Sequence, residues 1–292
     1  MSAHLRGIDH VLIGVGDLEQ ARHIWARLGF VVTPRGRHEG WGTANHCIMF
    51  PNDYLELLGL VEPGAPSGGL EEALCSRGDG LLGLALASAD RDATADAWAG
   101  AGLEVGTADL ARLLEDGSGT RLRFANVTLD DPPAGLRLFA CQALDPEPLR
   151  RHEWLAHSNG AQGIGSMTLA TRRPAAFASV LGNLFGENAL TFTDDLLTIH
   201  SGHGLLFVAS ADDLEMLHPA LGPVAVTDEL RPVALTLLVE DVERSAAGFD
   251  EAAVSYDREA GATLAVAADE ASGVHLEFTA AEQFHLRPGV RA

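Results

Sequence analysis

The sequence lacks the long apolar segments and the paired cysteines that mark many membrane and secreted proteins. No run of about 18 apolar residues occurs, so no membrane-spanning helix is expected. The first residues carry His4 and Arg6 without a long apolar core, which argues against a secretory signal there. The 3 cysteines, Cys47, Cys75 and Cys141, form no C-x-x-C pair. Structural disulfides are therefore not expected, and a reducing cytoplasm fits best.

Basic residues are also scarce. The chain has 20 Lys and Arg residues against 41 Asp and Glu residues, which gives a formal net charge of −21. Such a surface repels phosphate backbones and anionic membrane faces, so nucleic acid and membrane partners are excluded. The P-loop and G-x-S-x-G motifs are absent too, which leaves nucleotide hydrolysis and esterase chemistry without support. The expected partner is a small-molecule substrate or ligand, and the expected assembly a homodimer.

One order of predicted elements recurs along the chain. In the first copy a strand over 8–15 precedes Asp17, a residue type that caps helix N-termini. Apolar residues at helical spacing then predict a helix that ends at Gly29. The remaining strands of this copy are predicted over 30–33, 44–50 and 54–58. The order of the module is therefore β-α-β-β-β.

Three further copies follow the first. In the last one Asp241 stands at the capping position that Asp17 has in the first copy. Its predicted elements are strands over 233–239, 254–256, 262–267 and 274–278 and a helix over 242–253. The two middle copies are weaker. They are bounded by strands over 80–87, 137–141, 164–171 and 204–209 and contain helices over 92–101 and 174–184.

The repeat predicts an α+β fold made of four tandem βαβββ modules. One module leaves a face of its small sheet exposed, whereas two modules close a curved sheet around a cavity, so four modules predict two barrels. We expect one half over 1–144 (modules 7–60 and 80–143) and one over 163–292 (modules 163–210 and 231–279), joined by a polar linker over 145–162. The alternative is two plain α+β domains whose likeness is accidental.

The opening residues carry a family resemblance. Ile8-Asp9-His10-Val11, Val15-Gly16-Asp17-Leu18 and Leu28-Gly29-Phe30 resemble the start of the vicinal oxygen chelate superfamily, which includes glyoxalases, antibiotic-sequestering resistance proteins such as those for bleomycin, and extradiol dioxygenases. The segments over 40–46, 54–57 and 154–161 resemble its glyoxalase-like domain branch. The likeness is good over 7–60, fair over 152–170, and specific for the fold rather than the reaction.

In that superfamily a metal-binding module offers one ligand on its first strand and a carboxylate on its last. The resemblance places His10 and Glu56 at these positions. Both lie within apolar strands, where an unpaired polar group is costly unless a partner such as a metal satisfies it. If Leu55 and Leu57 pack against the helices, Glu56 points into the barrel. The alternative is that His10 only holds a hydrogen bond and Glu56 lies on an exposed face.

The same register shows which other modules keep ligands. The two ligand positions of the middle modules hold no metal-binding residue: Gly83, Phe139, Ser166 and Phe207. In the fourth module Ala234 replaces the histidine, but Glu277 keeps the carboxylate. Monomeric four-module glyoxalases of the superfamily pair their modules crosswise, and pairing module one with module four would bring His10, Glu56 and Glu277 together. We expect this pairing, with pairing of modules one and two as the alternative. Such a site suits Zn²⁺, Mn²⁺, Fe²⁺, Ni²⁺ or Co²⁺.

Four more residues are expected near the substrate. The resemblance places Trp41 and His46 of the Gly-rich loop, and also His157, beside the pocket; solvated or purely local turns are the alternatives. His275 lies two residues from Glu277 on the same strand, so both face one side of the sheet. His275 is therefore a candidate second histidine.

These features favour a metal-dependent enzyme of the glyoxalase type, an isomerase or lyase. The ion would hold two vicinal oxygens of a small molecule and stabilise an oxyanion, while Glu56 or Glu277 moves a proton. One alternative is a protein of the same fold that binds or sequesters a small molecule without turnover, favoured by the loss of the histidine in three modules. Another is an extradiol dioxygenase, which requires iron with two histidines and one carboxylate.

Overall fold

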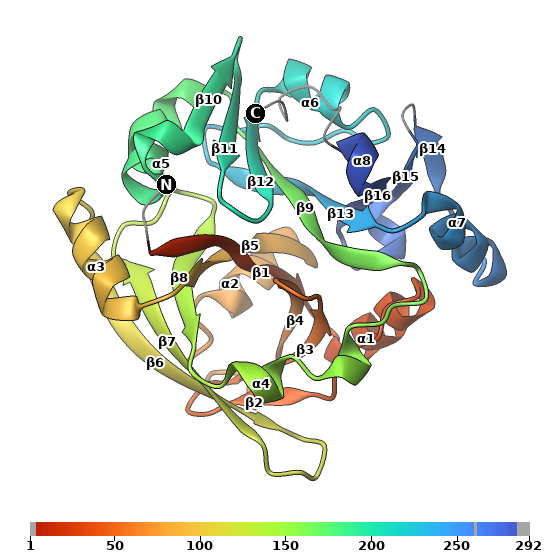
Figure 1. Cartoon of the computed structure of the whole chain (residues 1–292), viewed down its shortest axis with the longest axis horizontal. Coiled ribbons are helices and arrows are strands. Elements are labelled where there is room, and N and C mark those ends of the chain that lie inside the picture. Colours follow the sequence, from red (N-terminus) through yellow and green to blue (C-terminus); the bar gives the residue numbers. More distant parts are fainter. Residues whose placement is uncertain (1–3, 260–261, 285–292) are drawn as a thin grey trace.

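The computed structural model describes residues 4–259 and 262–284 of the chain (Figure 1). Its strands form two eight-stranded sheets, one for each half of the sequence. The first sheet is a closed barrel with the order β1-β4-β3-β2-β6-β7-β8-β5, and the second is an open sheet with the order β10-β11-β12-β9-β13-β16-β15-β14. In the described part of the chain no helix has the length and apolar character needed to span a membrane.

The barrel half contains eight strands and its covering helices. In chain order they are β1 (Leu5–Val15), α1 (Leu18–Arg27), β2 (Gly36–His38), β3 (Thr43–Met49), β4 (Tyr54–Leu60), α2 (Leu70–Arg77), β5 (Gly80–Ser88), α3 (Arg91–Gly100), β6 (Val105–Leu114), β7 (Arg121–Leu129) and β8 (Arg137–Ala143). The short helix α4 (Pro146–Leu149) and a 3₁₀ turn (His152–Trp154) follow in the connection between the halves.

The second half repeats this order with shorter strands. Its elements are β9 (Ala161–Ala170), a 3₁₀ turn (Pro174–Phe177), α5 (Ala178–Phe185), a 3₁₀ turn (Glu187–Ala189), β10 (Leu190–Thr193), β11 (Leu196–His200), β12 (Leu205–Ala209), α6 (Ala211–Leu217), β13 (Arg231–Val239), α7 (Val242–Glu251), β14 (Asp257–Glu259), β15 (Thr263–Val266), a 3₁₀ turn (Ala268–Glu270), β16 (His275–Ala280) and α8 (Ala281–Phe284).

The four βαβββ modules predicted from the sequence are present. In each module the first strand pairs in parallel with the last, as β1 does with β4 and β13 with β16. The predicted capping aspartates also act as expected. Asp17 accepts a hydrogen bond from the backbone N–H of Gln20, and Asp241 accepts one from that of Glu243. These caps fix the start of each helix at the same distance from the preceding strand.

The crossed pairing of modules is wrong. Strand β1 pairs antiparallel with β5, and β9 pairs antiparallel with β13, so module one closes its barrel with module two, and module three pairs with module four. The connection from β4 to β5 contains only the two-turn helix α2, which returns the chain directly to the open edge of β1. Sequential neighbours therefore meet before a distant module can.

Two predicted strands are also misplaced. The segment over 30–33 lies outside the sheet, whose strand β2 forms a few residues later. Its N–H groups are used elsewhere: that of Val31 donates to Nδ1 of His157, and that of Thr33 donates to the carbonyl of Cys47. In the fourth module the segment over 254–256 likewise precedes its strand, β14. Strand propensity alone could not show that the N–H groups of Val31 and Thr33 are bonded outside the sheet.

The two halves share a core of aromatic side chains. The ring centroid of Phe30, after α1, lies 6.0 Å from that of Phe278 on β16. Phe278 in turn packs edge-on against Phe249 of α7 at 5.0 Å. Because neighbouring residues on a strand face opposite sides, this contact turns Glu277 away from the first half.

Candidate active site

A cavity of about 370 Å³ lies inside the barrel of the first half. Its walls are largely apolar and include the aromatic rings of Trp41, Tyr54, Phe124 and Phe139. The polar lining comes from several barrel strands and includes His10, His38, Glu56, Arg112, Asn126 and Arg137. A mostly apolar pocket with a few convergent polar groups is the usual form of a small-molecule site.

Glu56 is central among these polar groups. On β4 it lies between Leu55 and Leu57, both fully buried, and it takes the opposite face of the strand. Its Oε1 accepts a hydrogen bond of 2.5 Å from Nδ2 of Asn45. Its two oxygens lie 3.6 Å from Nε2 of His10 and 3.5 Å from Nε2 of His38.

The surroundings of Glu56 favour its ionised form. Burial opposes ionisation, but the hydrogen bond from His38, the charges of His10 and His38, and the hydrogen bond from Asn45 outweigh it. The pKa of Glu56 is therefore held well below its usual range. A carboxylate of this kind is a weak proton acceptor and a good electrostatic anchor or cation ligand.

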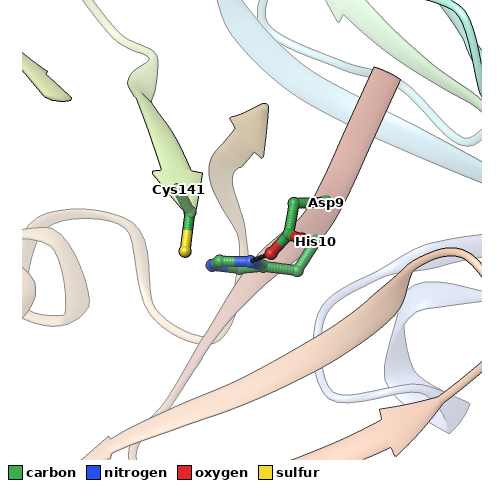
Figure 2. A group of neighbouring side chains, drawn as sticks. All are labelled: Asp9, His10 and Cys141. Carbon is green, nitrogen blue, oxygen red and sulfur yellow. Dashed lines mark hydrogen bonds and ion pairs between the residues drawn. The ribbon is translucent and has the colours of Figure 1, made fainter. Parts of the chain in front are cut away.

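His10 is held at one edge and on one face of its ring. Its Nδ1 lies 2.7 Å from Oδ2 of Asp9, and its face stacks on Tyr54 with ring centroids 4.5 Å apart. Figure 2 shows the Asp9 carboxylate at one edge of the imidazole and the Cys141 sulfur at the other. The donor atoms of Asp9, His10 and Cys141 all lie within 4.8 Å of one another. Burial, with the charges of Asp9 and Glu56, raises the pKa of the Cys141 thiol, so the thiol is neutral unless a cation binds it.

His38 on β2 supplies a second imidazole. Its Nδ1 lies 2.8 Å from Oγ1 of Thr43, which leaves Nε2 on the side of Glu56 and Asn45. Both histidines therefore have one ring nitrogen held by a partner and the other facing the Glu56 carboxylate. A carboxylate on the far nitrogen of a histidine, as Asp9 provides for His10, is typical of metal-binding sites. Two imidazoles and a carboxylate are suitable donors for a divalent transition metal.

The second half contains a similar group of residues. On β16, Glu277 pairs with Thr236 of β13 just as Glu56 pairs with Leu12 of β1. Its Oε1 lies 2.6 Å from Nδ1 of His218, whose Nε2 lies 2.7 Å from Oγ1 of Thr168. His275 lies beside the pair, with Nε2 3.7 Å from Glu277. The donor atoms of His218, His275 and Glu277 all lie within 4.8 Å of one another.

The expected ligand set of His10, Glu56 and Glu277 is therefore not one site. Glu277 belongs to the second sheet and points into it, because Phe278 occupies the face towards the first half. His275 lies with Glu277, as their two-residue spacing predicted, and is remote from the barrel cavity. The cause is the sequential pairing of modules, which separates the first and fourth modules.

Two other expected pocket residues do not line the cavity. His46 faces the outside of the barrel, where Nδ1 lies 2.7 Å from the carbonyl of Thr33, because its neighbour Cys47 takes the inner face. His157 is buried between loops: Nδ1 accepts from the N–H of Val31, and Nε2 donates to the carbonyl of Met49. Burial also lowers the pKa of His157. Both histidines hold backbone in place, whereas Trp41 does line the cavity.

Several residues at the site were missed in the sequence. His38, Arg112 and Arg137 line the cavity and come from β2, β6 and β8, Asn45 of β3 contacts Glu56 beside it, and no short motif joins them. For Asn45 a weak signal existed, because it stands two residues before Cys47 on the strand opposite Glu56. Arg112 could not be found this way, because its strand β6 was not predicted. For Arg137 a signal existed, because it stands two residues before Phe139 on the predicted strand over 137–141 and so shares its face.

Comparisons with known proteins agree with this architecture. The family model of a glyoxalase-like domain matches residues 8–185. No curated protein matches the chain in sequence. A hypothetical protein from Staphylococcus aureus has a similar structure, with a TM-score of 0.67, 12% identity and coverage of 94% of this chain and 98% of that one.

Two further solved structures are similar. A 4-hydroxymandelate synthase variant from Streptomyces coelicolor gives a TM-score of 0.60 at 12% identity, covering 99% of this chain and 94% of that chain. A fusion of a xylose isomerase-like TIM barrel with a 4-hydroxyphenylpyruvate dioxygenase gives 0.55 at 14% identity, covering 95% of this chain and 48% of that chain. At such identities the likeness concerns the fold alone.

Proposed function

Because the chain belongs to the glyoxalase-like domain family of the vicinal oxygen chelate superfamily, we propose that it is a metal-dependent enzyme acting on a small oxygen-bearing molecule in the barrel cavity. One observation carries the proposal. The ionised Glu56 carboxylate lies between the Nε2 atoms of His10 and His38 at the wall of a cavity of about 370 Å³. Two of these residues stand at the ligand positions of the superfamily.

In this proposal His10, His38 and Glu56 hold a divalent ion. When bound, the ion supplies Lewis-acid stabilisation of an oxyanion on a substrate with two vicinal oxygens. The other residues prepare the site. Asp9 orients the His10 ring, and Asn45 holds the Glu56 carboxylate. The low pKa of Glu56 favours a role as metal ligand over a role as general base.

Metal analysis tests this proposal. We expect freshly purified protein to hold about one divalent ion per chain, and chelator-treated protein to rebind it in a calorimetric titration. His10→Ala and Glu56→Gln should each abolish tight rebinding of the ion, because each removes one of its proposed ligands. His23→Ala is the matched control, since this histidine lies on the outer side of α1. Unchanged rebinding in the Glu56→Gln protein would refute the proposed site.

A specific observation favours a second candidate, a protein that binds a small molecule without a metal. The module that completes the barrel offers only Gly83 and Phe139 at its two ligand positions. If the purified protein holds no metal and His10→Ala leaves ligand binding unchanged, this candidate prevails. Retention of iron with oxygen consumption on catechols would instead support ring cleavage, for which His38 supplies the second histidine.

A further inference from the structure

We propose that the barrel cavity recognises a small carboxylic acid, with Arg137 and Arg112 as its carboxylate-binding residues and an apolar or aromatic body as the rest of the ligand. This inference deepens the proposed function, since it names the substrate class of the same cavity. It does not need the metal, because the two arginines act whether or not an ion is bound.

The first observation is that Arg112 and Arg137 lack the carboxylate partners that many other arginines of the molecule have. All 20 basic residues other than histidine are arginines, in a chain of net charge −21. Many pair with carboxylates at the surface, as Arg121 does with Glu39 at 2.7 Å and Arg258 with Glu243 at 2.7 Å. Among the described residues, neither Arg112 nor Arg137 has a carboxylate within 4.0 Å of its guanidinium. The cavity thus holds two cations without ion-pair partners.

Arg137 is the more available of the two. It begins β8 opposite Gly83, lines the cavity, and makes no side-chain hydrogen bond within the described part of the chain. The loop at Gly68 closes over it so tightly that a Cβ there would lie 2.8 Å from Nη2. Burial lowers the pKa of Arg137, and the Glu56 charge only partly compensates. A partly buried guanidinium of this kind gains most from an anionic partner.

Arg112 is fixed but incompletely satisfied. On β6 it is buried, its guanidinium lies 5.4 Å from the centroid of the Phe124 ring, and Nη1 donates to Sγ of Cys47 at 3.0 Å. Its Nε has no hydrogen-bond partner. Burial raises the pKa of the Cys47 thiol to about 11, so this partner is neutral. Burial alone would lower the pKa of Arg112, but Cys47, Tyr54 and Glu56 raise it, so the guanidinium stays charged; of these three groups only Glu56 is a carboxylate.

The charges that line the cavity give it a positive excess. Before any ion binds, the side chains that line the cavity include two guanidinium groups, Arg112 and Arg137, against the Glu56 carboxylate. Asp109 at the wall is already paired with Arg91 at 2.8 Å, and Asp9, which does not line the cavity, lies 2.7 Å from Nδ1 of His10. One further negative charge balances this set. The walls beside the arginines carry Phe124 and Phe139 and leave room for an apolar body. A monocarboxylate fits these conditions, since a guanidinium can bind both of its oxygens.

The test compares benzoate with benzamide, two probes of the same shape that differ in charge. Both are titrated calorimetrically into chelator-treated full-length protein. We expect benzoate to bind tighter by about tenfold or more, because it adds charge-assisted hydrogen bonds. Arg137→Gln should remove most of this preference, and Arg137→Lys should restore part of it. Arg22→Gln on the exposed face of α1 is the control and should leave the preference intact.

A variant that is expected to bind benzoate more tightly keeps the test valid even if the arginine variants fold poorly, because a folding defect cannot increase affinity. Glu56→Gln removes the competing anion, so we expect it to tighten benzoate binding and leave benzamide unaffected. Equal binding of the two probes, absence of benzoate binding, or an unchanged preference in a folded Arg137→Gln protein would each overturn the inference. If only the metal proposal is wrong, the purified protein will contain no bound ion but will still bind benzoate more tightly than benzamide.

Discussion

Glu56 in the first half and Glu277 in the second stand at the same place in their modules, yet their surroundings differ. Glu56 lies at the wall of an open cavity with two histidines and an amide around it. Glu277 is fully buried, and His218 and Thr236 bind its two oxygens. In the first strand of the module His10 faces Glu56, whereas the corresponding residue near Glu277 is Ala234.

Equivalent positions in two modules of a repeat therefore need not have the same role. In the barrel, closure of the sheet leaves a space next to Glu56, with polar side chains turned towards it. In the second half the loop after α6 carries His218 into the corresponding place and satisfies the carboxylate internally. We therefore expect Glu56 to contribute mainly to binding and Glu277 mainly to stability.

The largest expected effect is on stability. Glu277→Ala should lower the free energy of unfolding by about 3 kcal/mol, because it removes the carboxylate that binds the buried Nδ1 of His218 and accepts from the Thr236 hydroxyl. Glu56→Ala should cost clearly less, since its neighbours can turn to water in the cavity. Urea unfolding followed by circular dichroism measures both. Equal losses for the two variants would break the proposed distinction.

The next effect concerns metal affinity. Asp9→Asn should weaken metal binding by about 10- to 100-fold, because Asp9 holds Nδ1 of His10. Thr236→Val, which removes the hydroxyl bound to Glu277, should leave the affinity unchanged. Calorimetric titration of chelator-treated protein gives both constants. If Thr236→Val weakened metal binding more than Asp9→Asn, the ion would belong to the group of His218, His275 and Glu277 in the second half.

A third prediction concerns the contact between the two halves. Asp53, before β4, accepts a hydrogen bond from the N–H of Ile164 in β9, and burial raises the pKa of its carboxyl to about 7. Because the ordinary value is 3.8, the folded state binds more protons than the unfolded state between these values. Stability should thus fall as the pH rises from about 4 to about 7, by at most about 1.4 kcal/mol per unit.

The matched variant for this prediction is Asp53→Asn, which keeps a hydrogen-bond acceptor for Ile164 but cannot ionise. Its free energy of unfolding should lack this component of the pH dependence. Chemical unfolding of both proteins at a series of pH values gives the comparison. Parallel stability curves for the wild type and the variant would show that Asp53 does not carry the effect.

The smallest expected effect is at His275. Its Nε2 is buried without a hydrogen-bond partner, so the side chain brings a desolvation cost with little return. His275→Leu should change the free energy of unfolding by less than about 1 kcal/mol in either direction. Thermal unfolding measures this change. A loss of unfolding free energy as large as that of Glu277→Ala would show that His218, His275 and Glu277 act as one unit.

Much of the fold could be predicted from periodicity and capping. The repeated strand–helix–strand order located all four modules, with a capping Asp in the first and last, and the alternation around Glu56 predicted its direction into the barrel. Weakly patterned strands such as β6 and β7 were not predicted, because a strand that is exposed on one face and lines a cavity on the other lacks a clear apolar period.

By itself the sequence determined the module, its count and the pair His10 and Glu56, because these depend on local spacing along one strand or helix. Only the tertiary structure decided which modules pair, and with them which side chains meet. Closure of β1 on β5 kept Glu277 out of the cavity and brought Arg112 and Arg137 into it. Strand order depends on contacts between distant segments, and no local pattern in the chain encodes it.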